Sequence, residues 1–191
     1  MRALFSAILA AVALGGCSGS DPSFKNTDIT GADYGKDFTL IDHTGKTRTL
    51  ADFRGKILVV FFGYTYCPDV CPTTLAVMGQ ALEMMGTQAD KIAPVFITVD
   101  PKRDTPEKIK AYIESFGPRF VGLTGDAGEI ANVAKEYRVY YREHPAENGN
   151  EYTVDHSGVI YLMDRDGAFV ANYSLETSPE NLAADLKKRL R

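Results

Sequence analysis

The sequence predicts an α/β fold in which helices cover both faces of a mixed β-sheet, and two observations support this prediction. Residues 57–62 (ILVVFF) and 94–100 (PVFITVD) are strongly apolar runs, each followed by a segment with helical spacing. Such runs are typical of parallel strands that are covered on both faces. Residues 158–173 have instead the pattern of an antiparallel hairpin with its turn at 164–167. The sheet is therefore expected to contain both strand directions.

The first predicted element of the domain is a small hairpin in residues 37–50, where apolar and polar residues alternate around His43, Thr44 and Gly45. The helix after the first buried strand is expected to start near Pro72. Its apolar positions recur at helical spacing at Leu75, Met78, Leu82 and Met85.

The helix after the second buried strand has Thr105 as its predicted N-cap and Pro106 as its first residue. Its core-facing residues are expected to be Ile109, Tyr112, Ile113 and Phe116. Further along lie a short strand at 120–125, a helix through Ile130, Val133 and Ala134, a strand near 138–141, the hairpin, and a capped helix at 178–190. A mixed sheet that ends in a hairpin and a helix is the thioredoxin-like arrangement, which is our fold prediction.

Length and composition fit one such domain preceded by an N-terminal segment. The chain has 191 residues, of which 45% are hydrophobic and 24% charged, so it has enough apolar residues for a sizeable core. The net charge is -4, and acidic and basic residues are interleaved. This argues against nucleic-acid binding, which needs a basic patch.

The N-terminal segment has the layout of a bacterial lipoprotein signal. Arg2 precedes an uncharged apolar stretch and small residues, and residues 14–17 (LGGC) resemble the lipoprotein box. We expect a signal peptide at 1–16, a lipid on Cys17, a flexible tether at 17–35 and the domain at 36–191. The mature protein would lie on the periplasmic side of a bacterial membrane, held there by its lipid. The alternative is a plain secretory signal with an incidental free Cys17.

Cys67 and Cys71 follow the first buried strand, at the edge of the sheet where sites gather in α/β folds. Pro72 makes Cys71 a candidate cap of the next helix, and a helix N-terminus favours thiolate. The pair could be a permanent disulfide, a redox pair or two ligands of a metal. A permanent disulfide would stabilise little because its loop is short, and the spacing is not that of thioredoxin-type oxidoreductases.

A metal site at the two cysteines needs a further ligand. Two thiolates select Cu(I), zinc or iron–sulfur chemistry, and structural zinc sites need four protein ligands. Copper accepts three ligands, and imidazole is the natural third. His156 reaches this edge if its strand runs antiparallel to 57–62. His43 is expected to face solvent, and His144 to lie in an exposed loop. No proline occurs between Pro145 and Pro179, where thioredoxin-type oxidoreductases place a cis-proline.

Four motifs, "GYTYCPDVCPTTL", "VDPKRDTPEKIKAY", "GLTG" and "DHSGVIYLMDRDG", together resemble the Sco/SenC family of copper chaperones. The resemblance extends from about Phe38 to Leu190. It implies that Cys67, Cys71 and His156 bind a copper ion, Cu(I) or Cu(II), and that the protein is membrane-anchored and thioredoxin-like.

The resemblance also implies a role in loading the binuclear copper centre of cytochrome c oxidase. The expected partners are the copper-accepting subunit of the oxidase and other copper or thiol-reducing proteins. Oxidation of Cys67 and Cys71 to a disulfide would close the copper site. The alternative function is a thiol–disulfide oxidoreductase that reduces the acceptor's cysteines. Many members of the family carry a transmembrane helix, whereas this chain is expected to use the lipid on Cys17.

Three carboxylates lie near the predicted site. Asp69 and Asp155 could orient His156 or tune the metal, or they could cap a turn and face solvent, respectively. Asp100 is expected to have a turn or capping role. The thioethers of Met78 and Met85 are expected in the core because of their helical spacing.

Overall fold

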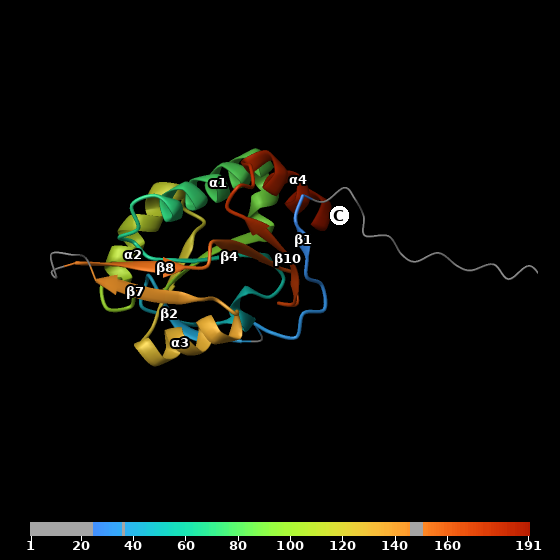
Figure 1. Cartoon of the computed structure of the whole chain (residues 1–191). Coiled ribbons are helices and arrows are strands. Elements are labelled where there is room, and N and C mark those ends of the chain that lie inside the picture. Colours follow the sequence, from blue (N-terminus) through green and yellow to red (C-terminus); the bar gives the residue numbers. More distant parts are fainter. Residues whose placement is uncertain (1–24, 36, 146–150) are drawn as a thin grey trace, which may run out of the picture.

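The computed structural model describes residues 25–35, 37–145 and 151–191. The described residues form an eight-stranded sheet with the strand order β1-β10-β9-β4-β5-β6-β2-β3 and a separate two-stranded sheet, β7-β8 (Figure 1). The main-sheet strands are β1 (Thr27–Asp28), β2 (Thr39–Asp42), β3 (Thr47–Thr49), β4 (Ile57–Gly63), β5 (Ile92–Thr98), β6 (Val121–Thr124), β9 (Val159–Met163) and β10 (Phe169–Ser174). The small sheet pairs β7 (Tyr141–Pro145) with β8 (Tyr152–His156).

Helices cover both faces of the main sheet, as predicted. They are α1 (Val70–Met85), α2 (Pro106–Ile113), α3 (Ala127–Glu136) and α4 (Pro179–Arg189), with short 3-10 turns at Leu50–Phe53, Gly86–Lys91 and Glu114–Phe116. Figure 1 shows α1 and α4 above the sheet and α3 below it. Strands β4, β5 and β6 are parallel neighbours, so right-handed crossovers place α1 and α2 on the same face.

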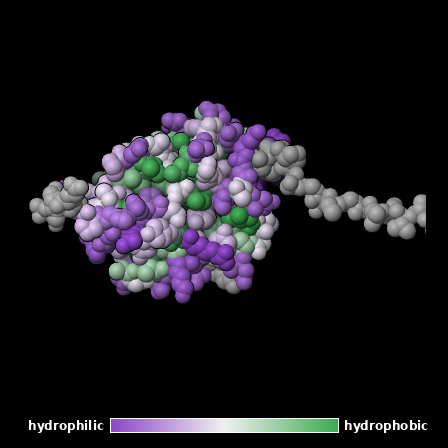
Figure 2. Space-filling view, viewed as in Figure 1, coloured by the Kyte–Doolittle hydropathy of each residue, from purple (hydrophilic) through white to green (hydrophobic). Residues whose placement is uncertain are grey.

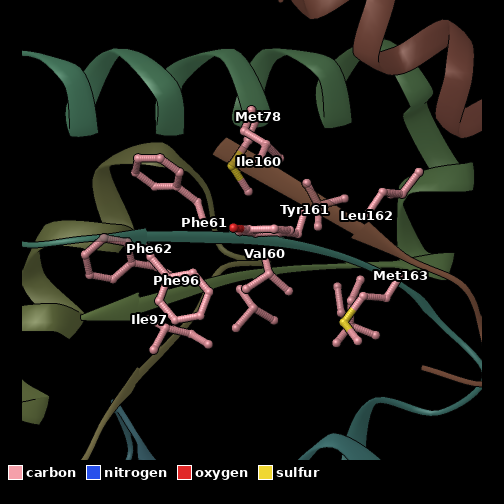
Figure 3. Close-up of a cluster of buried hydrophobic side chains, with 14 of the residues drawn as sticks. Val60, Phe61, Phe62, Met78, Phe96, Ile97, Ile160, Tyr161, Leu162 and Met163 are labelled. Carbon is pink, nitrogen blue, oxygen red and sulfur yellow. The ribbon is translucent and has the colours of Figure 1, made fainter. Parts of the chain in front are cut away.

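Strand β4 is buried along its whole length, which explains its unbroken apolar sequence. Figure 3 shows the two layers that it separates, with Met78 of α1 and Ile160 on one side and Val60, Ile97 and Met163 on the other. Both Met78 and Met85 are buried, which confirms their predicted place in the core. The surface seen in Figure 2 is mainly hydrophilic, with hydrophobic residues showing over α1.

Helix α1 begins earlier than predicted. It starts at Val70, with Asp69 as the N-cap residue, rather than near Pro72. Cys71 therefore lies inside the first turn and is not the cap. Proline is tolerated in a first turn because its missing N–H has no partner there anyway, so Pro72 did not mark the start.

The segment from 138 to 156 also differs from the prediction. Strand β9 does pair antiparallel with β4, but His156 ends the preceding strand, β8, and is not part of β9. His144, predicted in an exposed loop, lies in β7. The strand predicted near 138–141 lies slightly later, as β7, and its partner β8 was missed because it is short and mostly polar.

The described part of the predicted tether, residues 25–35, packs on the domain. Thr27 and Asp28 form β1 against β10, and the buried Asp185 of α4 accepts hydrogen bonds from the Lys25 amide (2.8 Å) and the Asn26 side chain (2.9 Å). The prediction missed this short strand because the Gly and Ser residues earlier in the segment are typical of a flexible tether. The predicted signal peptide and Cys17 lie outside the described residues. Among the helices of the described part, none is both long and apolar enough to span a membrane.

Candidate metal centre

Cys67, Cys71 and His156 converge at the carboxyl end of β4. One potential ligand atom of each residue lies within 4.8 Å of those of the other two. Cys67 comes from the loop after β4, Cys71 from the first turn of α1, and His156 from the end of β8. Two segments that are far apart in sequence, the one with both cysteines and the one with His156, thus bring two sulfurs and one imidazole nitrogen together. This ligand set suits a soft metal ion.

The two cysteines are free thiols with different environments. Cys67 is half-buried and Cys71 is fully buried. The amide of Cys71 donates a hydrogen bond to the Cys67 sulfur at 3.4 Å, as expected at the open end of a helix. Gly63 leaves the room that the Cys71 sulfur occupies, because a Cβ at Gly63 would lie 2.7 Å from that sulfur.

The thiols share a proton unequally. A hydrogen bond from the Cys71 side chain is the main cause that lowers the pKa of Cys67 to about 5, with backbone N–H groups of Asp69 and Cys71 assisting against the effect of burial. The pKa of Cys71 is raised, first by this interaction with Cys67 and then by burial. At neutral pH the reduced pair therefore carries one thiolate, on Cys67, and one thiol, on Cys71.

His156 is oriented so that one ring nitrogen faces the sulfurs. Its Nδ1 lies 3.2 Å from the carbonyl oxygen of Ser157 and donates to it, since a carbonyl only accepts. The Nε2 lone pair then points at the Cys71 sulfur, 3.3 Å away. The rings of Phe61 and Tyr64 form T-shaped contacts with the imidazole, with centroid-to-centroid distances of 5.9 and 6.0 Å, respectively. A backbone partner on Nδ1 is the usual way to prepare Nε2 as a metal ligand.

Asp104 fixes the loop that carries Cys67. Its carboxylate is completely buried and accepts hydrogen bonds from the Thr65 amide (2.9 Å), the Thr65 hydroxyl (2.6 Å) and the Thr98 hydroxyl (2.6 Å). Burial is the main cause that raises the pKa of Asp104, and these donors oppose it. Thr65 is two residues before Cys67, so Asp104 ties the cysteine loop to the end of β5.

Arg103 fixes the strand that carries His156. Its guanidinium lies 3.6 Å from the centroid of the Tyr152 ring and donates to the Tyr152 carbonyl at 2.9 Å. It also forms an ion pair with the buried Asp100, which accepts a second hydrogen bond from the Tyr152 hydroxyl at 2.7 Å. Tyr152 begins β8 and His156 ends it. The β5–α2 loop therefore holds both arms of the metal centre.

The remaining candidate residues have other partners. Asp69 supports the first turn of α1 through its backbone, because its carbonyl accepts hydrogen bonds from the amide and the hydroxyl of Thr73. Its side chain is exposed. Asp155 is exposed and pairs with His144 at 2.9 Å, on the opposite face of β8 from His156. The prediction that Asp155 orients His156 therefore has no support in the geometry.

His43 does not face solvent as predicted. It is half-buried, and its Nδ1 accepts a hydrogen bond from the Gly122 amide at 3.2 Å. Asp100 has the predicted turn role, since its carbonyl accepts from the amides of Arg103 (3.2 Å) and Asp104 (3.0 Å), and its carboxylate is also the buried ion-pair partner of Arg103. Arg103 and Asp104 were not predicted as site residues. Their signal was the "VDPKRD" sequence, which puts four charged groups just after a buried strand, where parallel strands end.

The fold and the site define a thioredoxin-like protein with a centre of two thiols and one imidazole. A model of the SCO1/SenC family matches residues 26–191. The chain therefore belongs to the SCO1/SenC family.

Relatives agree with this assignment. The mitochondrial SCO2 homologue of Bos taurus is 42% identical over 156 residues, which are 81% of this chain and 59% of that protein. The copper-bound structure of ScoI from Bradyrhizobium japonicum is 49% identical, covers 82% of this chain and 99% of that one, and has a TM-score of 0.77. A SCO1/SenC family lipoprotein from Bacillus anthracis is 29% identical over 82% of this chain and 94% of its own, with a TM-score of 0.69.

This chain spans about three fifths of the length of the curated mitochondrial SCO2 homologues that it matches.

Proposed function

We propose that this protein is a lipid-anchored, extracytoplasmic copper chaperone. It binds one copper ion through Cys67, Cys71 and His156 and delivers that ion to the binuclear copper centre of cytochrome c oxidase. The observation that carries the proposal is the convergence of the three ligand atoms within 4.8 Å. The copper-bound structure of the Bradyrhizobium relative supports the choice of metal.

The chemistry of the donors favours copper over its competitors. Thiolate and imidazole ligands suit Cu(I), and three ligands satisfy it, whereas a structural zinc site takes four. Cys67 is already a thiolate at neutral pH, so copper has to displace only the proton of Cys71. The imidazole offers a free Nε2 without rearrangement. The apo site is therefore preorganised for its cargo.

Redox chemistry of the cysteines would control release. Oxidation of Cys67 and Cys71 to a disulfide forms one S–S bond and removes two electrons, together with any protons that the thiols still hold. An oxidised thiol–disulfide partner would accept these electrons and be reduced to its dithiol. Since two of the three ligands are lost, copper leaves, and reduction of the disulfide reopens the site.

The anchor is the lipid on Cys17. The "LGGC" sequence supports it, and the similar protein from Bacillus anthracis is a SCO1/SenC family lipoprotein. The protein would then lie on the periplasmic side of a bacterial membrane. Mass spectrometry of the mature N-terminus should find a diacylated or triacylated Cys17, and an unmodified terminus elsewhere would contradict this.

A thiol–disulfide oxidoreductase is the second candidate function. The observation that favours it is the half-exposed Cys67 thiolate beside a protonated Cys71, which is the arrangement of an attacking and a resolving thiol. This function needs both cysteines but does not need His156.

Copper titration separates the two candidates. The reduced protein without residues 1–17 should bind one equivalent of Cu(I) in competition with a chromophoric chelator, and His156→Ala should weaken binding by about tenfold or more. Disulfide-reductase turnover is measured on the same samples. If His156→Ala keeps full copper affinity, the three-ligand site is wrong. If wild type binds no copper but turns over disulfides, the oxidoreductase is the function.

A further inference from the structure

Exposed apolar side chains gather next to the metal centre. Only six large hydrophobic residues are exposed in the described ranges, and four of them lie at this edge: Tyr66, Val70, Leu175 and Tyr140, whose backbone bonds to Ser157 next to His156. Tyr66 precedes Cys67, and Val70 precedes Cys71. Leu175 follows β10 and packs over Gly158, where an added Cβ would lie 2.4 Å from its Cδ1. Scattered single apolar residues need no explanation, but a group beside a site indicates a contact surface.

A positively charged side chain, Lys108, lies next to Tyr66 at this edge. Lys108 is exposed, lies 5.2 Å from the Tyr66 ring centroid and donates to its hydroxyl at 3.1 Å. The nearby Arg103 has its charge matched by the buried Asp100. Aromatic residues are enriched at the core of protein–protein contacts, and charged groups such as Lys108 belong to the polar rim.

The N-terminal segment enters the domain at the same edge. Lys25 and Asn26 line a hollow with Ser174, Glu176 and Thr177, in the turn that carries Leu175. Asp185 holds them there. Lys25 is eight residues after Cys17, so a lipid on Cys17 would lie at most about 29 Å from it. An anchored domain would therefore be held near the membrane surface on the side of Lys25, next to the turn that carries Leu175.

We propose that Tyr66, Val70, Leu175 and Lys108 form the docking surface for a membrane-bound, copper-accepting protein that presents a carboxylate beside its own thiolate and imidazole ligands. The proposal rests on the copper chaperone function. Docking here brings the acceptor's ligands onto the Cys67 side of the copper, which is the more exposed side, while Cys71 stays buried. The carboxylate pairs with Lys108 and orients the acceptor.

Copper transfer tests the surface. The double variant Leu175→Ser/Lys108→Glu is compared with Ile41→Ser/Lys46→Glu. These control residues are also exposed, but they lie in β2 and just before β3, at the opposite margin of the sheet. Each copper-loaded protein is mixed with the purified, reduced, metal-free copper-accepting domain of cytochrome c oxidase. We expect the first variant to transfer copper at least about fivefold more slowly, and the control at the wild-type rate. Transfer to the chelator bathocuproine disulfonate should not change in either.

Each other outcome has a defined meaning. If the first variant transfers copper to the acceptor at the wild-type rate, the docking surface is wrong and the chaperone function stands. If wild type binds no copper or transfers none to the acceptor, the chaperone function fails, and the proposal fails with it. Vesicles of phosphatidylethanolamine and phosphatidylglycerol are the remaining arm. If they bind the unlipidated wild type but not the first variant, the surface meets the bilayer, and the proposal is overturned.

Discussion

Arg103 stacks on Tyr152, with 3.6 Å between the guanidinium carbon and the ring centroid, and this contact ties the end of β5 to the strand that carries His156. The neighbouring Asp104 holds Thr65 in the cysteine loop. Two consecutive residues thus set the distance between the imidazole and the sulfurs. They touch no ligand atom directly, so we regard them as positioning residues.

Arg103→Lys should weaken both the fold and the copper site. Lysine keeps a charge near Asp100 but has no planar group to stack on Tyr152 or to reach its carbonyl at the same time. We expect the free energy of unfolding to fall by about 1–2 kcal/mol and the copper affinity to fall by about threefold or more. Chemical denaturation and chelator competition measure the two effects.

The control for Arg103→Lys is Arg119→Lys, which makes the same change in an exposed ion pair with Asp90, at the opposite ends of β5 and β6. It should change neither quantity measurably, because exposed pairs are screened by water. Equal effects of the two variants would contradict the assignment of the loss to the stacking on Tyr152 and the bond to its carbonyl.

Thr65→Val should loosen the cysteine loop. Valine has nearly the same shape but removes the hydroxyl that donates to Asp104 at 2.6 Å, and the buried carboxylate loses one of its three donors. The free energy of unfolding should fall by about 1–2 kcal/mol. Thr65→Ser keeps the hydroxyl and should recover most of this loss. If Thr65→Ser is as destabilising as Thr65→Val, the hydrogen bond is not the cause.

Gly63→Ala should displace the Cys71 sulfur. The new Cβ would lie 2.7 Å from that sulfur and 3.1 Å from both Phe61 and Phe96, so β4 offers no space for it. We expect copper affinity to fall by about tenfold and the melting temperature to drop, since overpacking costs about 1–3 kcal/mol.

Gly79→Ala is the matched control for Gly63→Ala. Its Cβ would lie 2.6 Å from the Phe116 carbonyl oxygen, far from the sulfurs. It should lower the melting temperature but leave copper affinity unchanged. Loss of copper binding in both variants would point to a general loss of folding rather than to displacement of Cys71.

The rate of alkylation of Cys67 should reach its maximum at a lower pH than that of an ordinary thiol. A lowered pKa of about 5 means that the reactive thiolate is present above that pH and is lost as the pH falls through it. In the reduced apo protein, iodoacetamide should modify Cys67 before Cys71, with a rate that levels off above about pH 6, whereas an ordinary thiol levels off above about pH 9. Peptide mass spectrometry reads out each site.

The expected origin of this profile is the Cys71 side chain, so Cys71→Ala should move the Cys67 profile to higher pH. A profile that stays in place would assign the lowered pKa to the helix N-terminus alone.

Much of the fold and the ligand set could be predicted from the sequence, because both follow from local patterns and strand direction. The buried runs at β4 and β5 specify parallel strands, and Cys67 and Cys71 follow the first of them directly. The antiparallel pairing of β9 with β4 then brings the segment before β9, including His156, to the same edge.

The supporting residues could not be predicted in the same way, because their roles depend on contacts between distant segments. Arg103 and Tyr152 are 49 residues apart, and Asp104 and Thr65 are 39 apart. The docking of residues 25–28 on α4 and β10 has the same cause, since Asp185 is 160 residues from Lys25. The spacing of apolar residues within one segment does not indicate which distant residue a side chain will contact.

The small β7–β8 sheet carries one of the three ligands yet is separate from the main sheet. Two strands alone are marginally stable, so this small sheet depends on its contacts with the rest of the domain. These include the buried side chain of Val154 as well as Arg103 and His156. A metal ion bonded to His156 and to both cysteines would add a further link between β8 and the cysteine loop. Amide exchange in β7 and β8 should therefore slow on loading more than exchange in β4. A partner protein could then distinguish the copper-loaded form by the reduced mobility of β7 and β8 as well as by contact with the metal itself.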